Sequence, residues 1–305
     1  MGEFGLIARI TDGLVMPPSV SVGPGDDAAC FLVNGSCVVS TDMYVEGVHF
    51  RLDWSEPAEI GRKVVGASVA DIEAMGAQPT MVLVALALPV NIAAGWSDAF
   101  TRGVRLECDK AAVTLVGGDV SRGPQVCVSV TAVGETSGVA PVTRAGARPG
   151  DLVACIGRLG WAAAGLGALT RGFRTPKDAV DAHRFPLVPY GAGRQAALAG
   201  ATAMIDVSDG LLADLGHIAD ASGVVIDIDT QCLAIGDAVS AVARAGGIDP
   251  LDYVLTGGED HALVATFAHG DVPMGWTIIG QASAGDPAVL VNGQAWAGNT
   301  GWRHF

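Results

Sequence analysis

Six short segments of this chain combine an apolar run with a glycine-containing turn rich in acidic residues. They span residues 23–29, 38–50, 69–77, 115–123, 204–215 and 255–263. Any fold of the chain must accommodate these carboxylates, because carboxylates that lie close together repel one another unless a cation lies between them. Oxygen ligands on flexible turns suit Mg²⁺, which proteins most often bind together with substrate phosphates. The pattern therefore indicates a magnesium-dependent site that handles phosphates.

Composition and charge argue against several classes of function. Half of the 305 residues are apolar and 16% are charged, which predicts a substantial core and argues against disorder. The formal net charge of −14 argues against a nucleic-acid partner, which needs a basic face, and against docking on an anionic membrane. No apolar stretch is long enough to span a bilayer, and the N-terminus carries no secretory pattern. The six cysteines include no C-x-x-C pair, which is typical of reduced thiols in a cytoplasmic protein.

Strand-like and helix-like segments alternate along the chain. Helices are expected at residues 3–10, 57–75, 94–108, 162–170, 192–199 and 210–223. Strands are expected at residues 28–33, 36–40, 80–88, 113–116, 126–133, 151–156, 203–206, 224–228, 262–267, 277–279 and 288–291. Asn34-Gly35 lies between two apolar runs and predicts a β-hairpin.

A segment rich in Gly, Pro, Thr and Ser interrupts this alternation and predicts a linker at residues 136–150. We therefore expect two α/β domains with mixed sheets, residues 1–135 and residues 151–305. Both halves carry acidic turns, so a ligand cleft between them is expected.

Phosphoryl transfer depends mainly on positioning and on neutralising charge. The chain has no G-x-x-x-x-G-K-[ST] phosphate-binding loop and no H-R-D or D-F-G kinase signature. Its three lysines, Lys63, Lys110 and Lys177, all lie outside the glycine-rich turns. If the protein handles ATP, metal ions must supply most of the positive charge, as Lewis acids and templates.

Each acidic turn also has a simple structural explanation. Aspartate forms Asx-turns and glycine tolerates positive φ, so residues 117–119 and 257–260 can be ordinary turns. Ser208 and Asp209 precede an expected helix, where caps and acids are favoured whatever the function. Asp71 can be a surface residue of its helix, although an unpaired carboxylate among its apolar neighbours would be costly.

Taken together and in order, the motifs indicate a protein family far more specifically than any single motif does. They read GEFGLI, GDDAA, STDMYVEGVHF, DIEAMGAQP, GGDVSRGP, VTRAGARPGD, DVSDGLLADLGHIA, GGED and GWRHF. This ordered set resembles the thiamine-monophosphate kinase family over nearly the whole chain. The resemblance implies the two-domain fold of the aminoimidazole ribonucleotide synthetase-like superfamily. Residues 1–135 would then bind ATP and metal and form a homodimer through their sheet, and residues 151–305 would form the C-terminal domain.

The resemblance also implies a reaction. ATP would phosphorylate thiamine monophosphate to thiamine diphosphate by direct in-line transfer, with several Mg²⁺ ions and no covalent enzyme intermediate. The acceptor phosphate is already anionic, so it needs no strong general base, and the main task is to remove the repulsion between two anions. Asp42 and Asp119 would contribute to catalysis through Mg²⁺ rather than as nucleophiles.

The family's site residues can be matched to this sequence one by one. Those that match metal ligands are Asp27, Ser40, Thr41, Asp42, Asp71, Asp119, Asp206 and Asp209. Those that match nucleotide contacts are Gly118, Asp119, Arg144 and Ser208. Those that match substrate contacts are His49, Glu259 and Trp302. Without the resemblance, Arg144 can equally form an interdomain salt bridge, and His49 and Trp302 are explained by packing.

The chain departs from the family pattern at His261-Ala262, where Tyr-Glu usually follows GGED. We expect this pair to begin a strand and to alter packing rather than activity. Two alternatives stay open. The protein can be another ATP-using enzyme of the superfamily, such as an aminoimidazole ribonucleotide synthetase or a selenophosphate synthetase, although residues 1–25 lack the cysteine and lysine that the latter needs. It can also be a non-catalytic module that binds a nucleotide or metal.

Overall fold

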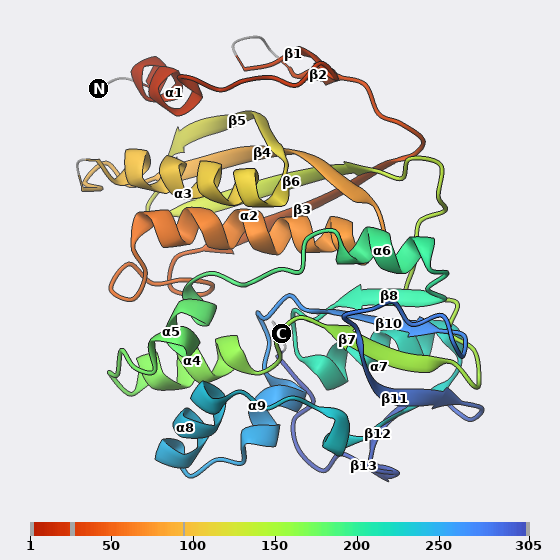
Figure 1. Cartoon of the computed structure of the whole chain (residues 1–305). Coiled ribbons are helices and arrows are strands. Elements are labelled where there is room, and N and C mark those ends of the chain that lie inside the picture. Colours follow the sequence, from red (N-terminus) through yellow and green to blue (C-terminus); the bar gives the residue numbers. More distant parts are fainter. Residues whose placement is uncertain (1–2, 25–27, 94, 303–305) are drawn as a thin grey trace. The chain divides into compact units, whose positions relative to one another are not determined.

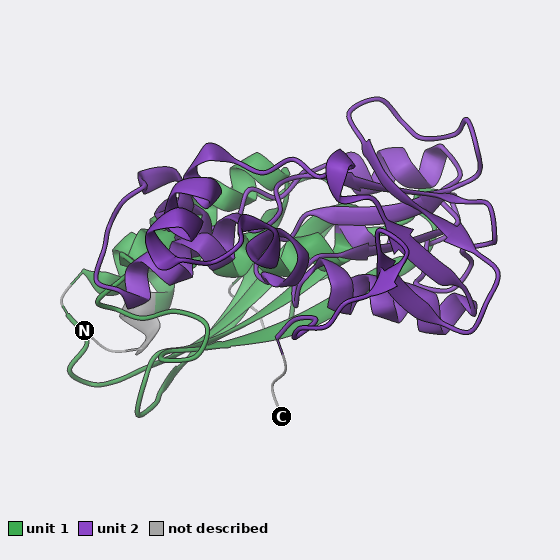
Figure 2. Cartoon of the chain, turned by 90° about the horizontal axis from the view of Figure 1, so that it is seen from below, with its two compact units in different colours: residues 1–72, 78–138 green, residues 73–77, 139–305 purple. Residues whose placement is uncertain are grey.

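The computed structural model describes residues 3–24, 28–93 and 95–302, with the backbone alone for residues 3–6. The chain divides into two compact units (Figure 2), which are Met1–Ile72 with Gln78–Gly138 and Glu73–Ala77 with Val139–Phe305. Both units combine helices with a sheet, and the larger sheet of each unit contains parallel and antiparallel pairs, so the expected α/β class with mixed sheets is confirmed. No helix in the described ranges has the length and apolar character needed to cross a membrane.

The first unit is built around a four-stranded sheet with the order β3-β6-β4-β5. Its elements are α1 (Glu3–Thr11), β1 (Val20–Val22), β2 (Cys30–Phe31), β3 (Cys37–Val45), α2 (Pro57–Ala74), β4 (Gln78–Leu88), α3 (Trp96–Ala111), β5 (Thr114–Arg122) and β6 (Cys127–Glu135). Strand β6 is antiparallel to β3 and β4, whereas β4 and β5 are parallel. Helices α2 and α3 lie on one face of this sheet (Figure 1).

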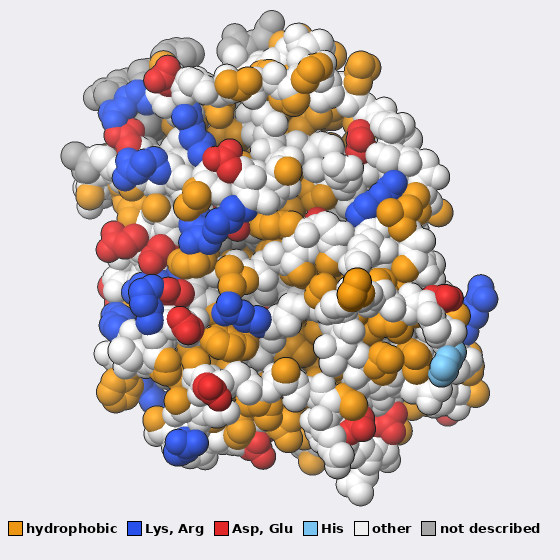
Figure 3. All heavy atoms as spheres, viewed as in Figure 1, with side chains coloured by type: hydrophobic (Ala, Val, Ile, Leu, Met, Phe, Trp, Pro, Cys, Tyr) orange, Lys and Arg blue, Asp and Glu red, His pale blue; other side chains and the backbone are white. Residues whose placement is uncertain are grey.

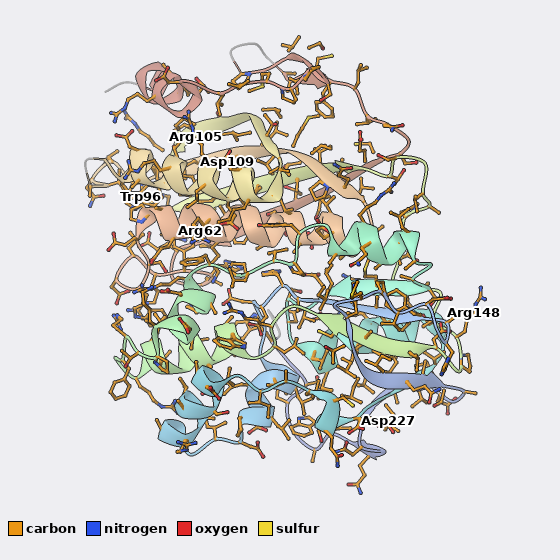
Figure 4. All side chains as sticks on the ribbon, in the orientation of Figure 1. Arg62, Trp96, Arg105, Asp109, Arg148 and Asp227 are labelled. Atoms are coloured by element: carbon orange, nitrogen blue, oxygen red, sulfur yellow. The ribbon has the colours of Figure 1, made fainter. Side chains whose placement is uncertain are left out.

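Two glycines allow α2 and α3 to approach each other closely. A Cβ atom on Gly61 would lie 2.3 Å from the carbonyl oxygen of Phe100, and one on Gly103 would lie 1.9 Å from that of Ala58. Any larger residue would therefore separate the helices. The buried carboxylate of Glu107 is satisfied across this contact by Nε of Arg62 at 2.8 Å (Figure 4).

The expected hairpin around Asn34-Gly35 is wrong. Strand β2 pairs instead with β1, and residues 37–45 form one long strand that pairs with β6 over nine residues. The backbone N–H of Asn34 donates to Oε2 of Glu135 at 2.8 Å, so the Asn-Gly turn is held by the end of β6. The long-range pairing satisfies more backbone groups than a short local hairpin would.

Two of the expected acidic turns are also wrong, because they lie within strands. The STD segment is in the middle of β3, and Gly118 with Asp119 is in the middle of β5. A Cβ atom on Gly118 would lie 1.9 Å from the carbonyl oxygen of Val84 on the neighbouring strand. Glycine is therefore required there by the close approach of two strands rather than by a turn.

The second unit contains a seven-stranded sheet with the order β13-β12-β9-β11-β7-β10-β8 among the described residues. Its elements are β7 (Leu152–Ile156), α4 (Trp161–Thr170), α5 (Lys177–Arg184), α6 (Ala192–Leu198), β8 (Ala203–Asp206), α7 (Leu211–Ser222), β9 (Val225–Ile228), a 3₁₀-helix η1 (Thr230–Cys232), α8 (Asp237–Gly246), α9 (Pro250–Thr256), β10 (Leu263–Phe267), β11 (Thr277–Ser283), β12 (Ala288–Val291) and β13 (Gln294–Ala295).

One edge of this second sheet gathers the segments that matter for function. Leu263 at the start of β10 pairs with Ile156 at the end of β7 and with Asp206 at the end of β8. Helix α7 follows β8 after four residues and packs its buried face, including Leu215 and Ile218, into the main core of the unit. The loops after β7 and β8 and the loop before β10 therefore lie side by side.

Candidate active site

Alternate side chains of β3 point toward α2. Ser40 Oγ donates a hydrogen bond to Oδ2 of Asp71 at 2.5 Å. The hydroxyl of Tyr44 donates to Oδ2 of Asp42 at 3.3 Å and shares a hydrogen bond of 2.9 Å with Oγ of Ser68. Burial, followed by the charge of Asp42, raises the pKa of Tyr44 well above its usual value, so this hydroxyl remains a donor. The structure thus brings three predicted ligands, Ser40, Asp42 and Asp71, to one face.

Two other predicted residues near β3 are placed differently. Thr41 points to the opposite face of the strand, where its Oγ1 shares a hydrogen bond of 3.0 Å with Oγ1 of Thr131. His49 follows the end of β3, and its Nδ1 accepts the backbone N–H of Val45 at 3.0 Å. Its ring contacts Tyr44 edge-on at 5.8 Å. His49 therefore lies next to the Ser40–Asp42–Asp71 face, whereas the Thr41 side chain does not.

Asp119 lies at the other edge of the same sheet. Asp42 pairs with Val130, Val130 with Val84, and Val84 with Gly118. Three interstrand spacings of about 4.8 Å put the Cα atoms of Asp42 and Gly118 about 14 Å apart. The two predicted catalytic aspartates, Asp42 and Asp119, are thus too far apart within this sheet to share one ion directly.

A cavity of about 650 Å³ adjoins Gly118 and Asp119 in the first unit. Its walls come from α1, the chain near β1 and β2, strands β4 to β6 and helix α3. Apolar side chains such as Ile10, Leu86 and Val104 dominate, and Thr101 supplies a hydroxyl. A mostly apolar hollow with a few polar groups at its wall is typical of a small-molecule site.

In the second unit, the loop after β8 is held by Asp214 of α7. Oδ2 of Asp214 accepts the backbone N–H groups of Ser208, Asp209 and Gly210 at 3.0, 3.1 and 3.0 Å. Burial, and then the charge of Asp206, raises the pKa of Asp214 to about 7. Because three donors converge on one oxygen, the positions of the predicted residues Ser208 and Asp209 are set by the first turn of α7.

The segment before β10 sends three successive polar side chains to three different elements. Oε2 of Glu259 lies 3.3 Å from Nδ1 of His183 on α5. Asp260 is buried and accepts two backbone N–H groups at the start of α4, at 2.5 and 2.8 Å. Nδ1 of His261 lies 3.0 Å from Oδ2 of Asp206. Glu259 and His261 both adopt positive φ values, 67° and 51°, which non-glycine residues rarely do.

Backbone hydrogen bonds join these segments into one cluster. The N–H of Glu259 donates to the carbonyl of Ser208 at 2.8 Å, and the N–H of Trp302 donates to that of Asp209 at 2.9 Å. Four predicted residues, Ser208, Asp209, Glu259 and Trp302, are therefore adjacent to one another and to Asp206. The expectation that His261 begins a strand is wrong, since β10 starts at residue 263 and His261 turns its side chain toward Asp206.

One predicted residue of the second unit lies outside these clusters. Arg144 is exposed, and its carbonyl accepts from Oγ of Ser222 at 3.1 Å, at the C-terminal end of α7. Ser208 lies at the opposite end of that helix, about 18 Å away at 1.5 Å per residue. The structure of the second unit therefore does not bring Arg144 and Ser208 together. Asp27 lies outside the described residues.

Two sets of oxygen donors could hold Mg²⁺. No group of three or more His, Cys, Asp or Glu side chains within the described ranges is arranged as a closed metal centre. The Ser40–Asp42–Asp71 face and the loop carrying Asp206 and Asp209 offer carboxylate and hydroxyl oxygens, which suit a hard cation that keeps waters and phosphates among its ligands. Both sets fit Mg²⁺ bound together with substrate.

Several residues of these clusters were not predicted as site residues. Some contact predicted residues and others hold the loops of predicted residues in place; they are Tyr44, His183, Asp214 and Asp260. An acid in the first turn of a helix is a weak signal that fits Asp214. Asp260 and His183 act through contacts between segments far apart in the chain, for which a single sequence carries no local signal. Tyr44 lies two residues from Asp42 on β3, so the two-residue alternation of a strand is the signal that fits it.

A family model described as "AIR synthase related protein, N-terminal domain" matches residues 25–136 of this chain. The chain is 48% identical to the thiamine-monophosphate kinase of Mycobacterium tuberculosis (strain H37Rv), over 100% of this chain and 92% of that protein. It is 39% identical to the thiamine-monophosphate kinase of Corynebacterium glutamicum, over 100% of this chain and 94% of that protein.

Solved structures give the same result. The thiamine-monophosphate kinase from Stenotrophomonas maltophilia K279a superposes with a TM-score of 0.82 at 32% identity, covering 96% of each chain. AaThiL complexed with AMPPCP and TMP superposes with a TM-score of 0.82 at 30% identity, covering 100% of this chain and 97% of that one. Hydrogenase maturation protein HypE, at 18% identity and a TM-score of 0.74, shares the fold alone. With full-length relatives of this similarity, the chain belongs to the thiamine-monophosphate kinase family of enzymes.

Proposed function

We propose that this protein transfers the γ-phosphoryl group of ATP to thiamine monophosphate, giving thiamine diphosphate and ADP. One observation carries the proposal: the chain aligns over its full length with AaThiL, a structure that holds AMPPCP and TMP together. AMPPCP is an ATP analogue that cannot be cleaved between its β- and γ-phosphates, so that complex pairs a nucleotide with the phosphate acceptor. Both oxygen-donor clusters described above suit phosphates bound with Mg²⁺.

In this proposal the base of ATP occupies the apolar cavity of the first unit. Gly118 and Asp119 line that cavity, so the phosphates would lie near the edge of β5. Arg144 and Ser208 remain proposed nucleotide contacts. Residues 1–135 would serve as the ATP- and metal-binding domain, joined by residues 136–150 to residues 151–305.

Thiamine monophosphate would be recognised by His49, Glu259 and Trp302. The indole of Trp302 is 60% exposed and can stack on an aromatic ring. The carboxylate of Glu259 is one-third exposed, so it can accept a hydrogen bond from an aminopyrimidine or offset a cationic thiazolium. The contact between Glu259 and His183 limits the rotamers of Glu259 and holds its carboxylate oxygens in place.

Phosphoryl transfer needs no nucleophilic side chain here. A phosphate oxygen of thiamine monophosphate attacks the γ-phosphorus in line, the new O–P bond forms, and the bond to the β,γ-bridging oxygen breaks, leaving ADP. The proposed ligands of several Mg²⁺ ions are Asp27, Ser40, Thr41, Asp42, Asp71, Asp119, Asp206 and Asp209. When bound, Mg²⁺ would offset the phosphate charge, the task that a lysine performs in P-loop enzymes. Asp42 and Asp119 are held apart by the sheet, so they would hold different ions.

The proposed enzyme is a homodimer in the cytoplasm. Val39 and Met43 are 59% and 61% exposed on the face of β3 opposite α2. Exposed apolar side chains on an open sheet face favour an interface, and a second copy of this sheet would cover them. The free thiols in the described part of the chain fit a reducing compartment.

The proposal is tested by incubating the purified protein with ATP, thiamine monophosphate and varied Mg²⁺. Thiamine diphosphate is then separated chromatographically and measured by fluorescence after oxidation. The expected result is thiamine diphosphate formed in equal amounts with ADP. ADP release with a different phosphorylated acceptor, and none with thiamine monophosphate, would favour another enzyme of the superfamily.

A further inference from the structure

Helix α1 forms one wall of the cavity in the first unit. Ile7, Ile10 and Thr11 of this helix line the cavity opposite β4 and β5. The helix has nine residues, and an isolated helix of that length is marginal in water. Its position therefore depends on contacts with the rest of the unit, chiefly with α3.

Arg105 of α3 binds the C-terminal end of α1. Its Nη2 donates to the carbonyl oxygen of Ile10 at 2.7 Å and also to that of Asp12. The last carbonyls of a helix lack partners within the helix and carry partial negative charge, so a guanidinium is well suited to this position. Figure 4 labels Arg105 between α3 and α1. An ion pair also joins Arg9 of α1 to Asp98 of α3.

Arg105 itself does not line the cavity. Its effect on a ligand must therefore pass through the position of α1. The surface over α1 and α3 carries acidic and basic side chains interspersed (Figure 3), so the helices are joined by specific pairs rather than by one charged patch.

We propose that Arg105 is a positioning residue for nucleotide binding, because it holds α1 in place as a wall of the nucleotide cavity. The inference rests on the proposed function, which puts the base of ATP in that cavity. It identifies a residue that controls affinity for the nucleotide without touching it. Thiamine monophosphate, bound through other residues, would be little affected.

The test compares Arg105→Ala and Arg105→Lys with the wild-type enzyme. Arg102→Ala is the matched control, because Arg102 is exposed on the same helix and makes no ion pair or side-chain hydrogen bond with the described residues. Binding of AMPPCP with Mg²⁺ is measured by calorimetry, KM is measured separately for ATP and for thiamine monophosphate, and thermal melting without ligand checks the fold.

Arg105→Ala is expected to raise the Kd of AMPPCP and the KM of ATP by about tenfold, the factor that corresponds to 1.4 kcal/mol. The KM of thiamine monophosphate should stay within about twofold of wild type, and Arg102→Ala should match wild type in both. Arg105→Lys should give an intermediate loss, since lysine keeps the charge but not the planar guanidinium.

Unchanged AMPPCP affinity in Arg105→Ala, or equal losses for ATP and thiamine monophosphate, would overturn the inference. If Arg105→Ala does not fold, Arg105→Lys decides alone, and wild-type affinity in that variant overturns it. A wild-type protein that binds no nucleotide would instead refute the proposed function, so the two failures are distinguishable.

Discussion

Nδ1 of His261 lies 3.0 Å from Oδ2 of Asp206, at the edge of the second sheet where β8 ends and β10 begins. His261 reaches this position from a left-handed backbone conformation with φ of 51°. The contact engages Oδ2 of Asp206 and restricts the orientation of this buried carboxylate. His261 thus orients a proposed metal ligand.

Replacing His261 should therefore weaken the use of Mg²⁺. We expect His261→Ala to raise the Mg²⁺ concentration for half-maximal velocity by roughly tenfold, because residues that orient metal ligands typically contribute that much to affinity. The measurement is a Mg²⁺ titration of initial velocity at saturating ATP and thiamine monophosphate. His217→Ala, at an exposed position of α7, is the control. An unchanged Mg²⁺ dependence would show that the contact with Asp206 is only structural.

Asp42→Asn and Asp119→Asn should each lower turnover by about a hundredfold or more, because each removes a charged ligand of a metal ion. Neither side chain belongs to the hydrophobic core, so melting temperatures should change little. Turnover is measured by release of ADP. Asp109→Asn on the surface of α3 (Figure 4) is the control and should behave as wild type. Near-normal activity in both site variants would refute the metal assignment.

The pH dependence of stability should contain a contribution from Asp260. Burial raises the pKa of Asp260 to about 7 in the folded protein, compared with about 3.9 in an unfolded chain. Between about pH 4 and pH 7 the folded state therefore binds more protons at this site than the unfolded state, so stability falls as pH rises through that window.

Asp260→Asn removes this titration while keeping one acceptor oxygen for the start of α4. We expect it to lower the free energy of unfolding by about 1–3 kcal/mol at pH 5, and by less at pH 8, where the wild type has lost the benefit of the raised pKa. Urea denaturation at the two pH values measures the difference. An equal or larger cost at pH 8 would contradict the assigned direction.

Met43→Asp should disrupt the proposed homodimer. Met43 is exposed on the free face of β3, so a charge there costs little in a monomer but is unfavourable in an apolar interface. Light scattering coupled to size exclusion should give a dimer for wild type and a monomer for the variant. A wild-type monomer, or a variant that stays dimeric, would be evidence against this interface.

The sequence predicts the family, the fold class and most helices correctly because the relevant signals are local or are ordered motifs. Helix α2 follows its apolar spacing closely, and α7 begins and ends near Gly210 and Gly223 as expected. The errors arise where pairing partners lie far apart in the chain. The Asn34-Gly35 signal is outweighed by pairing of β3 with β6, and the acids of the STD and GGD segments lie on strands for the same reason.

In the candidate site too, local patterns predict some features, whereas contacts between distant segments determine the others. The resemblance assigns Ser208 to the nucleotide, Asp209 to a metal ion and Glu259 to the substrate, and a backbone hydrogen bond from Glu259 to Ser208 brings these residues side by side. The separation of Asp42 from Asp119 follows from strand order, which no local pattern encodes. The roles of His183, Asp214 and Asp260 depend on tertiary contacts between α4, α5, α7 and the loops, so they emerge only from the structure.

Direct, metal-dependent transfer of phosphate from ATP to thiamine monophosphate can be followed in a single-turnover experiment with γ-labelled ATP. We expect label lost from ATP to appear as the terminal phosphate of thiamine diphosphate, no label to be retained on the protein, and EDTA to abolish the transfer. Label retained on the protein before product forms, or no labelled thiamine diphosphate at any Mg²⁺ concentration, would contradict it.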